Sequence, residues 1–109
     1  MAYDEALADR VKTVLKGRRS VVEKKMFGGL CFMVNGNMAC GVEKKKLVVR
    51  VGPDDYEKFL KLKHVRKMDF TGKPLKGFIY VMPDGLSRTD SLKKWVDRGV
   101  RFAQSLPKK

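Results

Sequence analysis

The chain is 109 residues long, with 43% hydrophobic and 34% charged residues. A chain of this length can bury one hydrophobic core but not two, so we predict a single domain over residues 1–109. The composition is typical of globular proteins and excludes disordered and collagen-like classes. No stretch reaches the roughly 20 apolar residues of a membrane-spanning helix, and the start MAYDE is unlike a signal peptide. We therefore expect a soluble, cytoplasmic protein without a membrane partner.

The formal net charge of +13 is the strongest signal in the composition. Such a charge attracts polyanions because binding releases their counterions, and nucleic acid is the obvious polyanion. The lysines and arginines are spread along the chain, however, and Lys44-Lys45-Lys46 is their one tight run. A dispersed excess of positive charge can serve solubility alone. Non-specific nucleic-acid binding is therefore one of two alternatives, and a continuous basic stripe would favour it.

The N-terminal segment has a helical pattern. Asp4 is a suitable N-cap, and apolar residues recur at helical spacing over 3–15, up to a glycine stop at Gly17. From Val21 to Phe27 the residues become β-branched and alternate, which predicts a strand. Gly28-Gly29 then ends that strand, because glycine permits the turns and close approaches that other residues do not.

The next segment predicts a tight β-hairpin. Leu30–Val34 and Asn37–Gly41 flank the dipeptide Asn35-Gly36, which is the preferred chemistry of a type I′ turn. A further β-branched strand, Leu47–Val51, follows and is closed by Gly52-Pro53. These segments predict four consecutive antiparallel strands.

A second helix is predicted to begin at Pro53, where proline fits the first turn and Asp54 and Asp55 favour the positive end of the helix dipole. After a basic stretch, 68–70 is expected to form a short edge strand before a turn. Residues 78–82 predict another strand. A turn then leads into the last helix.

Thr89 or Asp90 is expected to cap the last helix, which Pro107 ends. The connections between strands are too short for parallel crossovers. We therefore predict an α+β fold with two layers, a mainly antiparallel sheet and the order α-β-β-β-β-α-β-β-α.

Several blocks of the sequence resemble the N-terminal domain of the TfoX/Sxy family, which contains bacterial competence regulators. The blocks occur in the same order over most of the chain: residues 25–29 (KMFGG), 35–38 (NGNM), 47–53 (LVVRVGP) with Tyr56, 68–74 (MDFTGKP) and 77–81 (GFIYV). The resemblance implies an α+β fold and a role in or near the control of transcription and DNA uptake. It implies no catalytic site.

Regulators of this family carry a second, C-terminal domain, which we expect this chain to lack. Only two residues follow Pro107. The competence function therefore cannot be transferred whole. The expectation from the family is a small non-enzymatic regulatory or protein-interaction module, with non-specific nucleic-acid binding as the alternative.

Cysteine chemistry offers two hypotheses. In a two-residue hairpin with regular pairing, Cys31 lies directly opposite Cys40, at about 4.5 Å between Cα atoms, which permits only a strained disulfide. In a reducing cytoplasm we instead expect two reduced, buried thiols. With His64 they supply three soft ligands, where a closed zinc site needs about four, so we expect no metal.

The sequence contains no arrangement typical of an active site. His64 is the only histidine and lies in a basic stretch, where we expect a solvated side chain with no group to orient it. The acidic residues occur singly or at helix starts, and no glycine-rich phosphate loop or serine elbow is present. We therefore predict a non-enzyme, with no cofactor and no small-molecule substrate.

Two groups of basic residues could contact anions. One is expected on loops at a single end of the sheet and comprises Lys44, Lys45, Lys46, Arg50, Lys73 and Lys76. The other is a stripe on the outer face of the last helix: Lys93, Lys94, Arg98 and Arg101. Both are also ordinary for solvated surfaces, so their coexistence indicates diffuse attraction of anions.

Both faces of the predicted hairpin are apolar, although an antiparallel sheet usually has a polar uncovered face. Leu30, Phe32, Val34 and Ala39 are predicted on one face, and Cys31, Met33, Met38, Cys40 and Val42 on the other. Either helices cover both faces, or the second face packs against a partner or another copy. We therefore predict a homodimer interface at Met33, Met38, Cys31 and Cys40.

Overall fold

The structure is a computed structural model that describes residues 3–18, 20–26, 28–69 and 76–107. Within these residues six strands form one open sheet in the order β1-β2-β3-β4-β6-β5, and every neighbouring pair is antiparallel. The strands are β1 (Val21–Met26), β2 (Gly29–Val34), β3 (Asn37–Glu43), β4 (Lys46–Arg50), β5 (Val65–Lys67) and β6 (Phe78–Val81).

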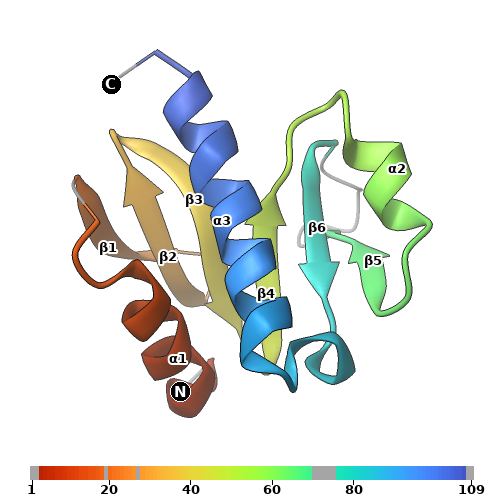
Figure 1. Cartoon of the computed structure of the whole chain (residues 1–109), viewed down its shortest axis with the longest axis horizontal. Helices are drawn as coiled ribbons and strands as arrows, with labels where there is room; N and C mark the ends of the chain where they lie inside the picture. The colour runs from red at the N-terminus through yellow and green to blue at the C-terminus, as the bar shows by residue number, and fades with distance from the viewer. Residues whose placement is uncertain (1–2, 19, 27, 70–75, 108–109) are drawn as a thin grey trace.

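Two helices cover one face of the sheet, which we call the helix side (Figure 1). They are α1 (Glu5–Leu15) and α3 (Thr89–Ser105), while the short α2 (Tyr56–Leu60) lies beside β5 and β6. A 3-10 helix, η1 (Pro83–Leu86), precedes α3. The predicted α+β class and element order are confirmed, with η1 as an addition. None of the described helices is both long and apolar enough to cross a lipid bilayer.

The N-terminal helix forms and docks as its sequence predicts. The Asp4 carboxylate accepts a hydrogen bond from the Leu7 backbone N–H at 3.1 Å, which caps α1. Arg10 then donates to the carbonyl of Leu86 at 2.6 Å and links α1 to η1. Beyond the helix, Arg18 forms a salt bridge with Asp97 of α3. These contacts link α1 to η1, and the turn after α1 to α3.

The hairpin turn is confirmed, but the pairing beyond it differs from the prediction. Asn35 and Gly36 have φ values of 54° and 81°, as a type I′ turn requires. Met33 pairs with Met38, and the register then shifts, so that Phe32 pairs with Cys40. Ala39 is the extra residue of a β-bulge, which a count outward from the turn does not reveal.

The bulge changes the position of both cysteines, so the predicted cross-strand thiol pair is wrong. Cys31 lies opposite Gly41, and Cys40 lies in the main core on the helix side. Val42 also lies on the helix side rather than with Met33 and Met38. The reason is geometric, because one inserted residue moves every later side chain of the strand to the opposite face.

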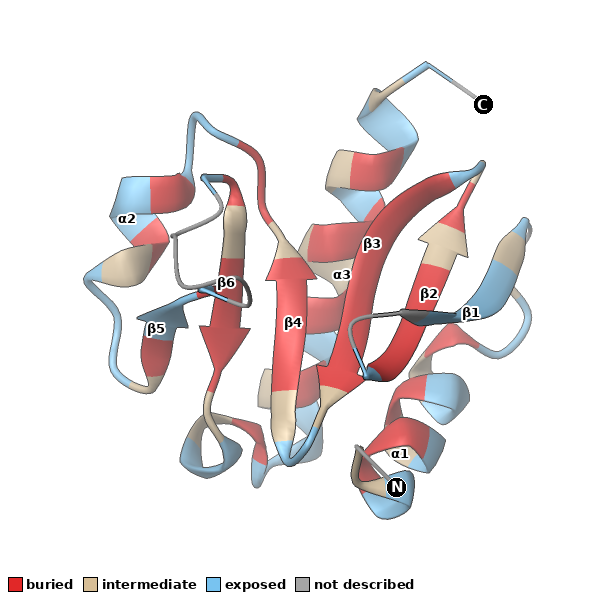
Figure 2. Cartoon of the chain, turned by 180° about the vertical axis from the view of Figure 1, so that it is seen from behind, coloured by how far each residue is buried: buried red, intermediate tan, exposed pale blue. Residues whose placement is uncertain are grey.

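The other face of the sheet carries a smaller buried group, which we call the rear cluster. Seen from behind, the central strands lie nearest the viewer and are mostly buried, with α1 and α3 beyond them (Figure 2). The rear cluster consists of Cys31, Met38, Val48, Met68 and Tyr80, with Met33, Phe78 and Met82 packed against it. The side chains of Cys31 and Met38 are therefore already buried within one chain, and so is that of Cys40 in the main core. Of the four predicted interface residues only Met33 is half-buried, and the oligomeric state itself stays a prediction.

Two element boundaries also differ from the prediction. The second helix begins at Tyr56, and Pro53 lies in the turn before it. The edge strand is β5 (Val65–Lys67), and Met68 follows it at 0% exposure in the rear cluster; Phe70 lies outside the described residues. Edge strands often carry charged side chains, which prevent pairing with further strands. Because two of the three residues of β5 are basic, the sequence pattern did not predict a strand there.

Candidate functional site

The first predicted basic cluster is divided between the two ends of β4, which corrects the expectation of a single cluster. Lys44 and Lys45 connect β3 to β4 and Lys46 is the first residue of β4, whereas Arg50 is its last. Four residue steps along a strand span about 13 Å, which keeps the two ends apart. Lys76 precedes β6, and because Phe78 pairs with Arg50, Lys76 lies near the Arg50 end. Lys73 lies outside the described residues.

The lysines of the β3–β4 loop are partly engaged within the fold. The Lys46 ammonium lies 4.1 Å from the centroid of the Tyr80 ring, a cation–π contact. The Tyr80 hydroxyl donates to the Glu43 carboxylate at 2.6 Å. Burial, with the hydrogen bond to Glu43, raises the pKa of Tyr80. The backbone carbonyl of Lys44 accepts from Asp4 N–H at 2.7 Å, so this loop also holds the start of α1.

A groove of about 500 Å³ between α2 and α3 brings charge and apolar surface together. We call it the α2–α3 groove, and it is lined by Val51, Asp55, Lys58, Phe59, Leu62, Arg98, Arg101 and Phe102. α2 supplies Lys58 and Phe59, with Asp55 just before the helix and Leu62 just after it. The lining residues of α3 are spaced three or four apart, so they share one face of that helix. Three cations face a single carboxylate there, which gives the groove an excess of positive charge.

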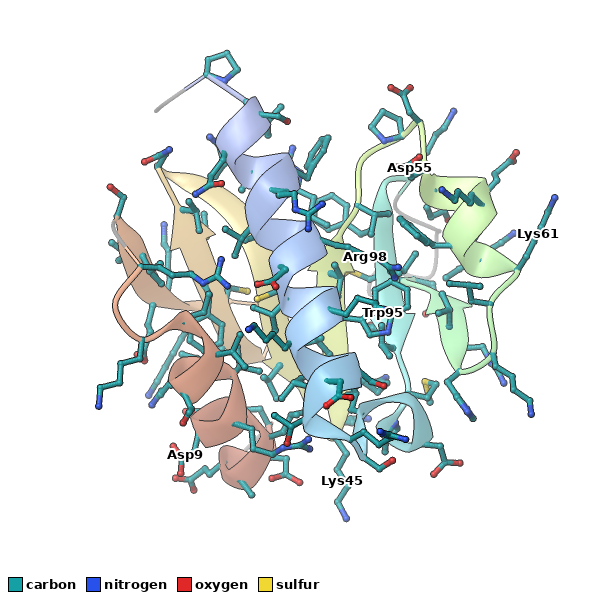
Figure 3. The ribbon with its side chains drawn as sticks, in the orientation of Figure 1. Asp9, Lys45, Asp55, Lys61, Trp95 and Arg98 are labelled. Carbon is teal, nitrogen blue, oxygen red and sulfur yellow. The ribbon has the colours of Figure 1, made fainter. Side chains whose placement is uncertain are left out.

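Arg98 is the centre of this groove. Its guanidinium carbon lies 4.7 Å from the Phe59 ring centroid and 4.5 Å from that of Trp95. The two rings meet edge to face at 5.5 Å and support the cation between the helices. In Figure 3, Trp95 and Arg98 project from α3 toward β6 and α2, and Asp55 lies at the start of α2. Partial burial lowers the pKa of Arg98, and the nearby charge of Arg101 adds to this effect.

The basic stripe predicted on the last helix is confirmed as one surface. Lys93, Lys94, Arg98 and Arg101 line a shallow hollow of about 600 Å³ along α3, together with Asp90 and Asp97. Arg98 and Arg101 line both this hollow and the α2–α3 groove, so the two are continuous. The sequence predicted the stripe but not its position beside α2, because the sheet determines where the two helices lie relative to each other. The spacing of Asp55, Lys58, Phe59 and Leu62 along one face of the second helix was the signal that could have been used.

The two cysteines lack the exposure and the lowered pKa of a nucleophilic thiol. Cys31 and Cys40 are both free and buried. Burial raises the pKa of Cys31 to about 11 and that of Cys40 to about 12, so both thiols are protonated at neutral pH. His64 is half-buried rather than fully solvated, and its carbonyl accepts from Met82 N–H at 2.7 Å. Within the described ranges, no three His, Cys, Asp or Glu side chains gather closely enough to hold a metal ion.

The buried thiols predict a loss of stability in alkaline solution. An unfolded thiol ionises near its ordinary pKa of 9.0, whereas the folded thiols ionise near 11 and 12. The thiols therefore contribute stability that is complete below about pH 9 and is lost as the pH rises through about 11 for Cys31 and about 12 for Cys40. Urea unfolding measured from pH 8 upward should show this decrease in the free energy of unfolding.

The double variant Cys31→Ala, Cys40→Ala is the control for this prediction. Its stability should decrease less steeply above pH 9 than that of the wild type, with a remaining slope from Tyr80, whose pKa is also raised. Equal slopes for the two proteins would contradict the assignment. In addition, the wild-type thiols should react with a disulfide reagent only after urea unfolds the chain.

Comparison with known proteins gives one match. A family model for the TfoX N-terminal domain matches residues 13–103, which is most of the chain and includes every strand of the sheet and nearly all of α3. No curated protein matched the chain. No solved structure matched it either. The family match agrees with the resemblance of the sequence blocks, and we conclude that the chain belongs to the TfoX N-terminal domain family.

Proposed function

We propose that this domain is a small non-enzymatic regulatory module, related to bacterial competence and transcription regulators, that acts by binding a protein partner. Membership of the TfoX N-terminal domain family supports a role related to such regulators. The observation that carries the choice of a protein partner is the distribution of charge. Cations lie on separate elements and alternate with carboxylates beside apolar side chains.

The charge pattern argues for a protein rather than for a nucleic-acid backbone. Lys44–Lys46 and Arg50 are at opposite ends of β4, and the stripe on α3 lies on the helix side of the sheet. Asp55, Asp90 and Asp97 interrupt the basic surface around α3. Phosphates avoid carboxylates, whereas protein surfaces present both signs of charge together with apolar groups. The basic stripe on α3 is therefore interrupted by carboxylates, unlike the uninterrupted basic surfaces typical of nucleic-acid-binding proteins.

Non-specific nucleic-acid binding is the second candidate, because the chain has a net charge of +13. Binding through many phosphate contacts would weaken steeply with salt, by about 10³-fold or more between about 50 and 200 mM. We expect instead a weak affinity for duplex DNA that changes by less than about tenfold over this range.

A filter-binding titration with duplex DNA at several salt concentrations measures this dependence. Affinity capture from bacterial lysate, with and without nuclease, provides the second part of the experiment. The protein-partner proposal expects the same partner to be retained after nuclease treatment. A steep dependence on salt, combined with loss of every partner after nuclease, would replace it with the nucleic-acid function.

A further inference from the structure

The α2–α3 groove exposes apolar surface beside its cations. Leu62, just after α2, is 44% exposed, and Phe102 of α3 is half-buried. Val51 and Phe59 form the buried floor beneath them. Large apolar side chains left open to water at a hollow are typical of binding surfaces. The volume of about 500 Å³ is within the range of sites that enclose a ligand or a few side chains of a partner.

The cations of the groove are available for an external anion. Among the described residues, no carboxylate lies within salt-bridge distance of Lys58, Arg98 or Arg101. The charge of Asp55 raises the pKa of Arg98, whereas burial lowers it. The two side chains do not form a salt bridge. Lys58 and Arg101 are exposed, whereas Arg98 is half-buried and packs against the rings of both Phe59 and Trp95.

Arg98 is suited to receive a carboxylate. Contact with both the Phe59 and Trp95 rings restricts the Arg98 side chain before any ligand binds, which lowers the entropy cost of forming further hydrogen bonds. A guanidinium carries parallel N–H groups that match the two oxygens of a carboxylate. Burial around the rings also reduces the water that competes for these donors.

The composition of the groove distinguishes between two classes of anion. A phosphate backbone offers no apolar side chain for Leu62 and Phe102. A peptide with acidic residues around a leucine or phenylalanine offers both an apolar anchor and carboxylates. Because the floor is apolar and the rim is basic, charge and apolar surface are both complementary to such a peptide.

Resting on the proposed protein-binding function, we propose that the α2–α3 groove binds an acidic segment of a partner protein. One large apolar side chain of that segment packs against Leu62 and Phe102, and flanking carboxylates pair with Lys58, Arg98 and Arg101. The partner is therefore defined by a short run of aspartate or glutamate around a bulky apolar residue.

A phage-display library of random linear peptides tests this proposal without assuming a sequence. Selection on the wild-type protein should enrich peptides that contain aspartate or glutamate beside leucine, phenylalanine or another bulky apolar residue. The affinity of an enriched peptide, labelled with fluorescein, is then measured by fluorescence anisotropy. Replacing its bulky apolar residue with serine should weaken binding by about tenfold, the equivalent of losing one buried anchor.

Charge-reversal variants locate the binding site. Lys58→Glu and Arg101→Glu should each weaken the affinity for the peptide by about tenfold or more, because each substitution removes an attraction and adds a repulsion. Both residues are exposed, so circular dichroism should show an unchanged fold. Lys61→Glu is the matched control, because Lys61 follows α2 by one residue but points away from α3 (Figure 3). It makes the same charge change and should alter affinity by less than about twofold.

Three results would overturn the proposal: no enrichment of acidic and apolar residues, equal weakening by Lys61→Glu, or tighter binding of an oligonucleotide of the same net charge to the same groove. Affinity capture with the Lys58→Glu and Arg101→Glu variants, after nuclease treatment, distinguishes failure of the groove proposal from failure of the proposed protein-binding function. If those variants still retain the partner, the protein-binding function stands and the groove is not its site.

Discussion

Replacing Gly99 with alanine should destabilise the protein, although alanine is the best helix former. Gly99 lies in the middle of α3, where the helix crosses β3. An added Cβ would lie well inside van der Waals contact distance of the Ala39 carbonyl oxygen and 3.0 Å from the carbonyl carbon. Both are backbone atoms, so neither can move without displacing the sheet. We expect a loss of about 2 kcal/mol for Gly99→Ala, in spite of a helix-propensity gain near 1 kcal/mol.

Gly99→Val should prevent folding at ordinary temperatures, because a β-branched side chain adds two more atoms at the same contact. Such a loss approaches the total stability of a small domain, about 5–15 kcal/mol. Thermal and urea unfolding, followed by circular dichroism, measure both changes. Lys94→Val is the matched control, since Lys94 is exposed on α3 and its replacement tests propensity alone. A Gly99→Ala protein as stable as the wild type would show that α3 does not lie this close to β3.

Met38→Asp should unfold the protein rather than dissociate a dimer. Met38 is 7% exposed in the rear cluster, with Cys31, Val48, Met68 and Tyr80 around it. A carboxylate there loses its hydration, the side chains of the rear cluster carry no positive charge, and the Tyr80 hydroxyl already donates to Glu43. An uncompensated buried charge costs about 3–5 kcal/mol, enough to unfold a domain of marginal stability. Urea unfolding should show this loss.

The matched changes for this position separate burial from self-association. Met38→Leu conserves volume and should cost less than about 1.5 kcal/mol. Val22→Asp places the same charge at a site that is 61% exposed on β1, next to Met33 in the sheet register, and should leave the fold intact. If a homodimer forms over the exposed part of this face, Val22→Asp should convert it to monomer in sedimentation experiments. A wild type that sediments as a monomer would end the dimer prediction, and a folded, monomeric Met38→Asp protein would place Met38 at an interface instead.

The local chemistry of the sequence determined most of the secondary structure. Asp4 and the spacing of apolar residues after it specify α1, because capping and helical periodicity act within a few residues. Asn35-Gly36 specifies the hairpin, because the type I′ turn needs positive φ at both positions. The order of helices and strands, and with it the α+β class, follows from such local signals.

The tertiary structure decided which side chains share a face. The bulge at Ala39 moved Cys40 and Val42 to the helix side, and a strand sequence alone does not show where a register shifts. The bulge lies where Gly99 of α3 meets Ala39, so helix packing and strand register were fixed together. The sequence did not predict β5, because two of its three residues are basic. Its strand conformation depends on pairing with β6, which the local sequence does not show.

The sequence predicted only one of the two parts of the candidate site, the basic stripe of α3. The basic stripe of α3 could be read from helical spacing, because all of its residues belong to one helix. The α2–α3 groove could not, because Lys58 and Leu62 meet Arg98 and Phe102 only after the sheet has placed two helices, about 40 residues apart in the chain, side by side. Periodicity describes one element at a time, whereas a groove between two elements depends on non-local packing.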